Sequence, residues 1–490
     1  MLFINHGIIT YKVFYFTFHA QNNAMKKSSL ALVLLIFTCS TFAQPKQINK
    51  QLPIGVFDSG TGGLTILQAI LTLDAFNNKT GEAGGDGIPD FTNEAFQYLA
   101  DQANMPYGNY AAANKTLLLK EHILKNMQFL LNKNFQTFNK TQWQAQNKPT
   151  VKMIVIACNT ATAYAIADIK KFVATQQQPV PVIGVIDAGV KAALEYYAKN
   201  PDGTIGVFAT AGTVASDGYP KALRALSTKA GMQQPIIVSQ GGAGLAESID
   251  RDFSYFSDTV TAARPSYKGP SVSNAQYPID TSLLNVYRFN HADNKILCEF
   301  DNTGRCLDIQ LNDPSNYVRY HLVSLLQKMK NENYPLPLNT LILGCTHYPY
   351  LKDTIHSVLQ ELYNYKSANQ FVYRKYLAED VALIDPGVET AKEAYIALRK
   401  QRLALSKPNS IANNFFITVP NKTLKEVELQ PDGWFTYGYK YGRTEKANKE
   451  YVKYVPFDTS NIVPATYLRF KKVLPDVYNK LHQVINGLTE

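Results

Sequence analysis

The chain has 490 residues, of which 46% are hydrophobic and 12% aromatic, and its 49 Lys and Arg against 39 Asp and Glu give a formal net charge of +10. This composition excludes a disordered, collagen-like or coiled-coil protein, and the length predicts two or three domains with a large apolar core. No block of Lys and Arg residues typical of nucleic-acid-binding proteins occurs in the sequence, so no nucleic-acid partner is predicted.

Residues 1–43 are predicted to be a leader that contains a secretory signal peptide over 25–43. Two lysines precede an apolar run over 30–37, and Ala43 ends a stretch typical of a cleavage site. The run is too short to span a hydrocarbon core of about 30 Å comfortably, which favours cleavage near Ala43. A lipoprotein site at Cys39 and an uncleaved anchor are the alternatives. We therefore expect an exported, periplasmic or extracellular protein with no stable membrane span after cleavage.

An internal repeat predicts two similar halves. Residues 54–57 read Ile-Gly-Val-Phe before a turn of small residues, and residues 205–208 repeat these four letters before a similar turn. A second pair of apolar runs ends in Cys158 and in Cys345, each followed by polar residues. Each run is typical of a buried strand that enters a turn. The same order of strands therefore occurs twice along the chain.

The predicted fold is α/β, with two parallel-sheet domains in a pseudo-twofold relation and the ligand site between them. Helical periodicity over 115–131 and 317–329, between the strands, favours parallel sheets with helical crossovers. The predicted segments are a first half over 53–180 with Cys158 and an insertion at about 74–95, a second half over 181–380 with Cys345 and an insertion at about 251–316, a closing segment over 380–402 that could complete the first half, and a C-terminal extension over 403–490.

Cys158 and Cys345 are both predicted at carboxyl ends of strands, where open parallel sheets bind ligands. If the halves face each other, the thiols approach a ligand from opposite sides. One thiolate could then remove a proton next to a carboxylate while the other thiol supplies one, because a thiol pKa can be brought near neutral pH. Two buried structural cysteines are the alternative. The polar residues placed to tune the thiols are Asp58, Asn159, Thr160, Thr346 and His347, and the loop over 58–63 offers backbone N–H groups to a carboxylate.

Six motifs in chain order, within 53–402, resemble the cofactor-independent aspartate/glutamate racemase superfamily, and glutamate racemase in particular. The motifs lie at 54–64, at 98–101 with 106–108, at 155–161, at 182–186 with 210–219, at 343–349, and at 383–387 with 389–391. The resemblance implies an isomerase that interconverts L- and D-glutamate by 1,1-proton transfer, without a cofactor or a metal. It also implies a small acidic amino acid as substrate and a link to D-glutamate supply or peptidoglycan metabolism.

The resemblance implies roles for particular residues. Cys158 and Cys345 would be the acid/base pair, assisted by Asp58 and His347. The family has a further acidic residue in the second half, and Glu247 and Asp250 both stay open for it. The residues that would hold the amino acid are Asp58, Ser59, Pro106, Tyr107, Gly108, Asn159, Thr160, Thr210, Thr213, Thr346 and His347.

Three segments depart from the family pattern. Residues 82–90 resemble a calcium loop but lack most of its early carboxylates, which favours a plain glycine-rich turn. Cys298 and Cys306 flank a turn at 301–304 and are expected to form a cross-strand disulfide outside the cytosol, with two free thiols as the alternative. The extension is rich in Tyr and Lys around 434–454, predicts strands more than helices, and could be a lid, an interface or a wall-binding surface.

Two other functions stay open. One is a racemase of another acidic amino acid, such as aspartate, and the other is an exported amino-acid-binding protein that lacks turnover. A zinc site at Cys158, Cys345 and His347 is disfavoured because the chain lacks paired CxxC knuckles. A homodimer is compatible with the sequence.

Overall fold

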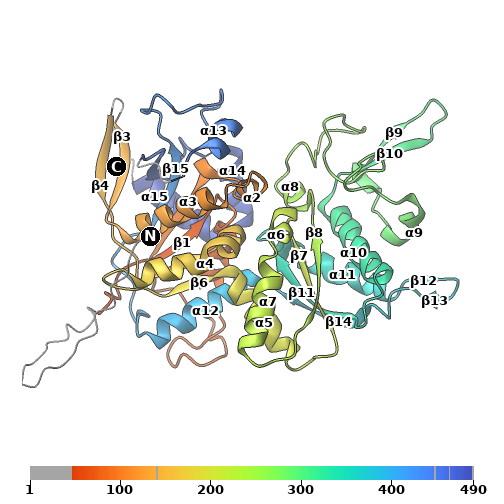
Figure 1. Cartoon of the computed structure of the whole chain (residues 1–490), viewed down its shortest axis with the longest axis horizontal. Helices are drawn as coiled ribbons and strands as arrows, with labels where there is room; N and C mark the ends of the chain where they lie inside the picture. The colour runs from red at the N-terminus through yellow and green to blue at the C-terminus, as the bar shows by residue number, and fades with distance from the viewer. Residues whose placement is uncertain (1–46, 140–141, 446–448, 463, 488–490) are drawn as a thin grey trace, which may run out of the picture. The chain divides into compact units, whose positions relative to one another are not determined.

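The first sheet has six strands in the order β16-β15-β2-β1-β5-β6. Figure 1 labels β1, β6 and β15 of this sheet. The computed structural model describes residues 47–139, 142–445, 449–462 and 464–487. β1 (Ile54–Asp58) pairs in parallel with β2 (Phe96–Ala100) and with β5 (Met153–Ile156), which in turn pairs with β6 (Val182–Gly184). Every residue of β1, β2 and β5 is buried. Most residues of these strands are apolar, because helices cover both faces of a parallel sheet.

The second sheet has four parallel strands in the order β14-β11-β7-β8. They are β7 (Thr204–Ala209), β8 (Ile236–Gly241), β11 (Leu338–Gly344) and β14 (Leu377–Ile384). If the four parallel core strands of each half are numbered in chain order, their spatial order is 2-1-3-4 in both sheets: β2-β1-β5-β6 in the first and β8-β7-β11-β14 in the second. The predicted α/β fold with two similar parallel sheets is therefore confirmed.

The positions of β6 and β14 bear on the predicted division of the chain. β6 is the fourth strand of the first sheet, so this sheet continues past residue 180. β14 is the fourth strand of the second sheet, and it does not complete the first one. The helix that follows it, α12 (Pro386–Lys400), packs against α1 (Leu64–Thr72) and α5 (Val185–Tyr197). Residues 380–402 therefore link the two halves, because their strand pairs within the second sheet while their helix packs against α1 of the first half.

Helices follow most of the strands, as the periodicity predicted. The expected helices over 115–131 and 317–329 are α3 (Thr116–Leu131) and α10 (Pro314–Asn331). The remaining helices up to residue 363 are α2 (Gly108–Ala112), α4 (Asn159–Ala174), α6 (Ala211–Ala215), α7 (Gly218–Lys229), α8 (Leu245–Ile249), α9 (Leu284–Tyr287) and α11 (Lys352–Tyr363), with short 3-10 turns at Gln102–Asn104, Thr281–Leu283, Ala292–Asn294 and Tyr348–Leu351.

Alternation along the strands sends side chains to different core clusters. Val56 and Val207 face a cluster that both sheets share with α1, α5 and α12. Phe57 faces a second cluster with α3 and α4, and Phe208 faces a third with α10 and α11. Because the first cluster contains residues of both sheets, the described residues from 47 to 487 pack as one compact unit.

The two insertions are held by local polar contacts. In the first, the Asp86 carboxylate accepts a hydrogen bond from Asn78 N, and the Asp90 carboxylate accepts from Ala75 N and Phe76 N. These carboxylates therefore hold the loop's own backbone. In the second, β9 (Ile296–Phe300) and β10 (Cys306–Leu311) form an antiparallel hairpin.

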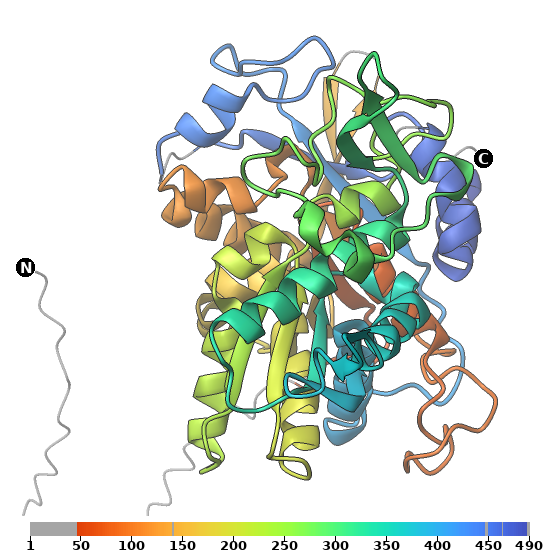
Figure 2. The same cartoon turned by 90° about the vertical axis from the view of Figure 1, so that its right-hand side faces the viewer.

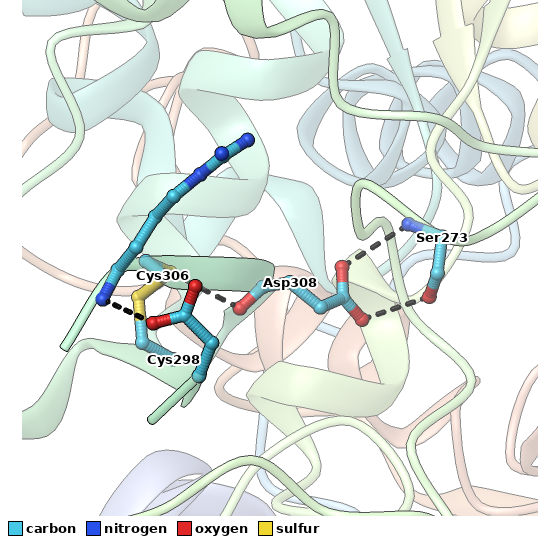
Figure 3. The surroundings of a disulfide bond; sticks show 6 residues. Ser273, Cys298, Cys306 and Asp308 are labelled. Carbon is cyan, nitrogen blue, oxygen red and sulfur yellow. Dashed lines mark hydrogen bonds between the residues drawn. A yellow bond between two sulfur atoms is a disulfide. The ribbon is translucent and has the colours of Figure 1, made fainter. Parts of the chain in front are cut away.

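A disulfide joins Cys298 and Cys306 across this hairpin, as expected from the turn between them (Figure 3). Asp308 lies two residues after Cys306 on β10. Its carboxylate accepts hydrogen bonds from the backbone N–H and the hydroxyl of Ser273 at 3.1 and 2.8 Å. The hairpin is thus tied to the loop that precedes it. Smaller hairpins are β3 (Asn134–Asn139) with β4 (Gln142–Asn147) and β12 (Lys366–Ser367) with β13 (Gln370–Phe371).

The C-terminal extension is built into the first half. β15 (Asn414–Pro420) pairs in parallel with β2, and β16 (Val452–Pro456) pairs with β15 in the antiparallel sense. α13 (Tyr437–Gly442) lies between these strands in sequence, and two longer helices follow them, so the expectation that the extension would form strands more than helices is wrong. α14 (Pro464–Val473) and α15 (Pro475–Gly487) follow and pack together, and α15 also contacts α1 (Figure 2).

Buried polar contacts join the extension and neighbouring segments to the core. Thr418 of β15 donates a 2.7 Å hydrogen bond to the fully buried Asp101 carboxylate. Lys152 is fully buried and pairs with Glu94 at 2.5 Å, and it also donates to the carbonyl oxygens of Lys50 and Leu403. These contacts fix segments that are far apart in sequence.

The predicted signal peptide and Cys39 lie outside the described residues. Within the part of the chain that the structure describes, none of the helices has the length and apolar character needed to cross a membrane.

Candidate active site

A cavity of about 440 Å³ lies where strands of both halves end. Asp58 ends β1 and Cys158 follows β5, while Thr210 follows β7 and Cys345 follows β11. All four residues line this cavity. Parallel strands present their carboxyl ends at one edge of each sheet, which is why residues from four separate parts of the sequence converge here.

The turn after β1 holds the Asp58 side chain in place. Asp58 Oδ2 accepts hydrogen bonds from the N–H groups of Gly60 and Gly63, both at 3.0 Å. A Cβ atom at position 63 would overlap the Asp58 side chain, so this position requires glycine. Burial raises the pKa of Asp58, although these N–H groups oppose the rise by stabilising the carboxylate.

Cys158 begins α4 and is 95% buried, with 5% of its surface exposed. Its thiol donates to Ser59 Oγ at 3.5 Å, and its sulfur accepts from Ala161 N at 3.4 Å. Burial and then the nearby Asp58 carboxylate raise the pKa of Cys158 from 9.0 to about 12, even though the hydrogen bonds oppose the change. The expectation of a thiol tuned toward neutral pH is therefore not met at Cys158, because burial and then the negative charge of Asp58 both disfavour the thiolate.

Cys345 has a different environment. Its sulfur lies 3.6 Å from His347 Nδ1, and His347 Nε2 lies 3.1 Å from Asp250 Oδ1. Burial lowers the pKa of His347, but the hydrogen bonds and charges of Asp250 and Cys345 outweigh this effect and raise it to about 10. His347 is therefore an imidazolium at neutral pH, which donates from one nitrogen to Asp250 and from the other toward Cys345.

This geometry distinguishes the two acidic residues that the sequence left open. Asp250 contacts His347 directly, and its pKa is lowered because His347 and Arg469 outweigh the effect of burial. Glu247 is coupled to His347 only through its charge, and burial raises its pKa. Asp250 is thus the acidic partner of the histidine in this structure.

Part of the cavity wall comes from the C-terminal extension, which the sequence did not place at the site. Arg469 of α14 forms an ion pair with Asp250, and the apolar side chains next to it on the same chain segment also line the cavity. The sequence carried no signal for this contact, because Arg469 follows Asp250 by 219 residues and lies outside the motifs. The apolar lining residues of this segment are Phe470, Val473 and Leu474.

The structure brings most of the predicted site residues together. Pro106, Tyr107 and Gly108 are not among the residues that line the cavity, where Met105 occupies this part of the wall. Tyr107 is buried and donates a 2.5 Å hydrogen bond to Asp101 instead. The predicted residues that do line the cavity are Asp58, Ser59, Cys158, Asn159, Thr160, Thr210, Thr213, Cys345, Thr346 and His347.

The surroundings of the thiols do not resemble a metal centre. Over residues 47–139, 142–445, 449–462 and 464–487, no three His, Cys, Asp or Glu side chains cluster as the ligands of a metal ion would. His347 has its two ring nitrogens directed to Cys345 and Asp250. The zinc alternative therefore gains no support from the arrangement of Cys158, Cys345 and His347.

Known proteins resemble this chain over most of its length. It is 28% identical over 371 residues to the glutamate racemase of Carnobacterium sp. (strain St2), a match that covers 75% of this chain and 90% of that protein. It is 24% identical over 379 residues to the glutamate racemase of Lactobacillus johnsonii, covering 77% and 92% of the two chains. No protein-family model matches the sequence.

Among solved structures, the glutamate racemase of Thermus thermophilus in complex with beta-chloro-D-alanine aligns with a TM-score of 0.40 and 21% sequence identity, over 76% of this chain and 88% of that one. The sequence relatives confirm the resemblance that the motifs predicted: the chain is similar to glutamate racemases, which are isomerases. A third curated relative, from Levilactobacillus brevis, is likewise named glutamate racemase, with 26% identity over 366 residues.

Proposed function

We propose that this protein is a cofactor-independent racemase that interconverts L- and D-glutamate by proton transfer between two cysteines. The observation that carries the proposal is that Cys158, from the end of a first-half strand, and Cys345, from the end of a second-half strand, line one cavity. Inversion of a stereocentre needs an acid and a base on opposite faces of the α-carbon. Two thiols supplied by two different halves meet that requirement.

The two thiols have different charged neighbours. The raised pKa of about 12 keeps Cys158 in the thiol form at neutral pH. Cys345 has the His347 imidazolium 3.6 Å from its sulfur, so this is the position at which a thiolate charge is better compensated. In one direction the Cys345 thiolate removes the α-proton, and the carbanion then takes the proton of the Cys158 thiol from the other face. The reverse direction starts from the Cys158 thiolate that this step leaves.

The polar lining of the cavity suits an amino acid with two carboxylates. Hydroxyl groups from both halves line it, while the N–H groups of Gly60 and Gly63 are already bonded to Asp58. A carboxylate bound by hydroxyl donors has its charge stabilised without a metal ion. The hydroxyl groups in question belong to Ser59, Thr160, Thr210, Thr213 and Thr346. The curated relatives are named glutamate racemases, which favours glutamate over aspartate.

We also propose that the protein acts outside the cytosol and that its product enters cell-wall metabolism. The proposal is supported by the signal-peptide pattern over 25–43 and by the disulfide between Cys298 and Cys306, a bond typical of oxidising compartments. N-terminal sequencing of the mature protein and fractionation of the producing cell test this part. A mature chain that begins near residue 44 supports export, and an intact leader on a cytosolic protein contradicts it.

The reaction is tested by proton NMR of L-glutamate and D-glutamate in deuterated buffer with mild reductant. We expect loss of the α-proton signal with the natural protein, and chiral chromatography of the same samples should show the other enantiomer. Neither Cys158→Ala nor Cys345→Ala should racemise, because each lacks one of the two proton carriers. L- and D-aspartate, run in parallel, decide between the two acidic substrates. Binding of glutamate without exchange would exclude the racemase and favour the amino-acid-binding alternative.

A further inference from the structure

The helix α14 of the C-terminal extension carries a charge into the candidate active site. Arg469 lies on the turn of α14 that lines the cavity, and 27% of its side chain is exposed. The racemase motifs of the sequence end near residue 402, so this helix lies outside the segment on which the resemblance is based. An arginine beside a reactive thiol pair needs an explanation that the motifs do not contain.

Arg469 is connected to Cys345 by a continuous chain of contacts. The Arg469 guanidinium donates to Asp250 Oδ1, and the same oxygen lies 3.1 Å from His347 Nε2. The other ring nitrogen of His347 lies 3.6 Å from Cys345 Sγ. When a hydrogen bond holds one nitrogen of a histidine ring, the direction of the other nitrogen is also fixed, because the ring is planar and rigid. Each member therefore restricts the position of the next.

Asp250 itself has little else to hold it. It follows the short helix α8, and 40% of its side chain is exposed. An exposed carboxylate at the end of a five-residue helix can adopt several rotamers. The guanidinium of Arg469 is anchored on the ten-residue helix α14, whose neighbour Phe470 is buried in the core that both sheets share. The longer helix thus supplies the fixed point.

We propose that Arg469 is a positioning residue of the active site: it holds Asp250 against His347 and so keeps the imidazolium beside Cys345. This proposal rests on the racemase function proposed above, since it assigns the C-terminal extension a part in the same reaction. The extension is then neither a separate lid nor only an interface, because the site is incomplete without it.

Other charged groups face the same contacts and must be considered in a test. The charges of Asp250 and Asp252 both act on Glu247 and raise its pKa, after the larger effect of burial. Tyr350 lines the cavity next to Arg469, and burial raises its pKa to about 12, so it is neutral over the range of an enzyme assay. Glu247 is the group that could replace Asp250 if Arg469 were removed.

The first test measures kcat, KM and the pH profile of Arg469→Gln, with Arg469→Lys as the conservative variant. Lys471→Gln is the matched control, because it removes the same charge from an exposed position of the same helix. We expect kcat of Arg469→Gln to fall by about 10- to 100-fold, the loss typical of a displaced catalytic group, with KM changed far less. Arg469→Lys should recover most of the loss, and Lys471→Gln should resemble the natural protein.

The direction of the pH change separates positioning from mere competition for Asp250. If Arg469 positions Asp250, its loss frees the carboxylate from His347, and the alkaline limb of the profile moves to lower pH as the pKa of His347 falls toward its ordinary value. If Arg469 only competes with His347 for Asp250, the limb moves to higher pH. The second result, or an unchanged profile, would overturn the proposal.

A double-mutant cycle tests whether the effect passes through Asp250. In an Asp250→Asn background, Arg469→Gln should change kcat by less than about twofold, because residues that act in series are not additive. A full additional loss in that background would show that Arg469 acts on the substrate or on the fold instead, and would also reject the proposal.

One readout does not depend on turnover. The titration of His347 can be followed by NMR of histidine-labelled protein, with His347→Gln to assign the signal. If the natural protein does not racemise glutamate but Arg469→Gln still lowers the pKa of His347, the contact chain stands and the proposed reaction fails. If the natural protein racemises but the His347 titration is unchanged in Arg469→Gln, the reaction stands and the role of Arg469 fails.

Discussion

The burial of Cys158 predicts that its thiol is alkylated slowly. Its pKa of about 12, against an ordinary 9.0, corresponds to about 4 kcal/mol in favour of the thiol. At pH 8 only about one molecule in 10⁴ would then carry the Cys158 thiolate, against about one in ten for an ordinary thiol. Since the thiolate is the nucleophile, alkylation of Cys158 should be slower by about three orders of magnitude from this cause alone.

The assay is alkylation by iodoacetamide in a Cys345→Ala background, with peptide mass spectrometry to follow the Cys158 site. We expect the rate to rise about tenfold for each pH unit between 7 and 10 without a plateau. Asp58→Asn keeps an oxygen for the two glycine N–H groups but removes the negative charge, so it should raise the rate by roughly tenfold. Asp202→Asn, at an exposed and distant position, is the matched control.

The slope of the pH dependence decides whether this reasoning holds. Poor access to the sulfur would slow alkylation at every pH but would leave a plateau above the true pKa. A plateau between pH 7 and 9 would therefore refute a raised pKa, and an unchanged rate in Asp58→Asn would refute the part assigned to the carboxylate.

Three further predictions follow from the described contacts. Glu94→Gln leaves the fully buried Lys152 without its counter-charge and should lower the free energy of unfolding by about 3–5 kcal/mol. The measurement is the urea midpoint, which should fall. A change below about 1 kcal/mol would contradict the importance of the pair. Because the pKa of His347 is raised to about 10 in the folded protein, its contacts stabilise the fold fully below its ordinary pKa of 6.5 and lose this effect as the pH rises through 10. Asp250→Asn should accordingly destabilise the protein at pH 6 and lose this effect above pH 10 in thermal melts, and a pH-independent difference would argue against the ion pair. Cys298→Ser removes the disulfide that closes a short loop, so the hairpin should lose about 2.5 kcal/mol of stability, measured by hydrogen exchange. Racemisation should be retained. Loss of racemisation would place the hairpin in the site.

Local patterns in the sequence were sufficient for the strands and for the two thiols. Four-residue apolar runs such as 54–57 and 205–208 predicted buried parallel strands because such runs have no polar face to expose. Cys158 and Cys345 were predicted at strand ends from the residues immediately around them. The disulfide between Cys298 and Cys306 followed from a turn of a few residues. In each case the deciding contacts are close together in sequence.

The tertiary structure decided what depends on contacts between distant segments. It assigned β6 and β14 to their sheets, and it selected Asp250 rather than Glu247 as the partner of His347. It also showed that the pKa of Cys158 rises, since burial and a neighbouring carboxylate are properties of the packed site and not of the motif. Arg469 is the extreme case: its role comes from a contact with a residue 219 positions earlier, and an isolated arginine on an amphipathic helix is most simply read as a solvated surface charge.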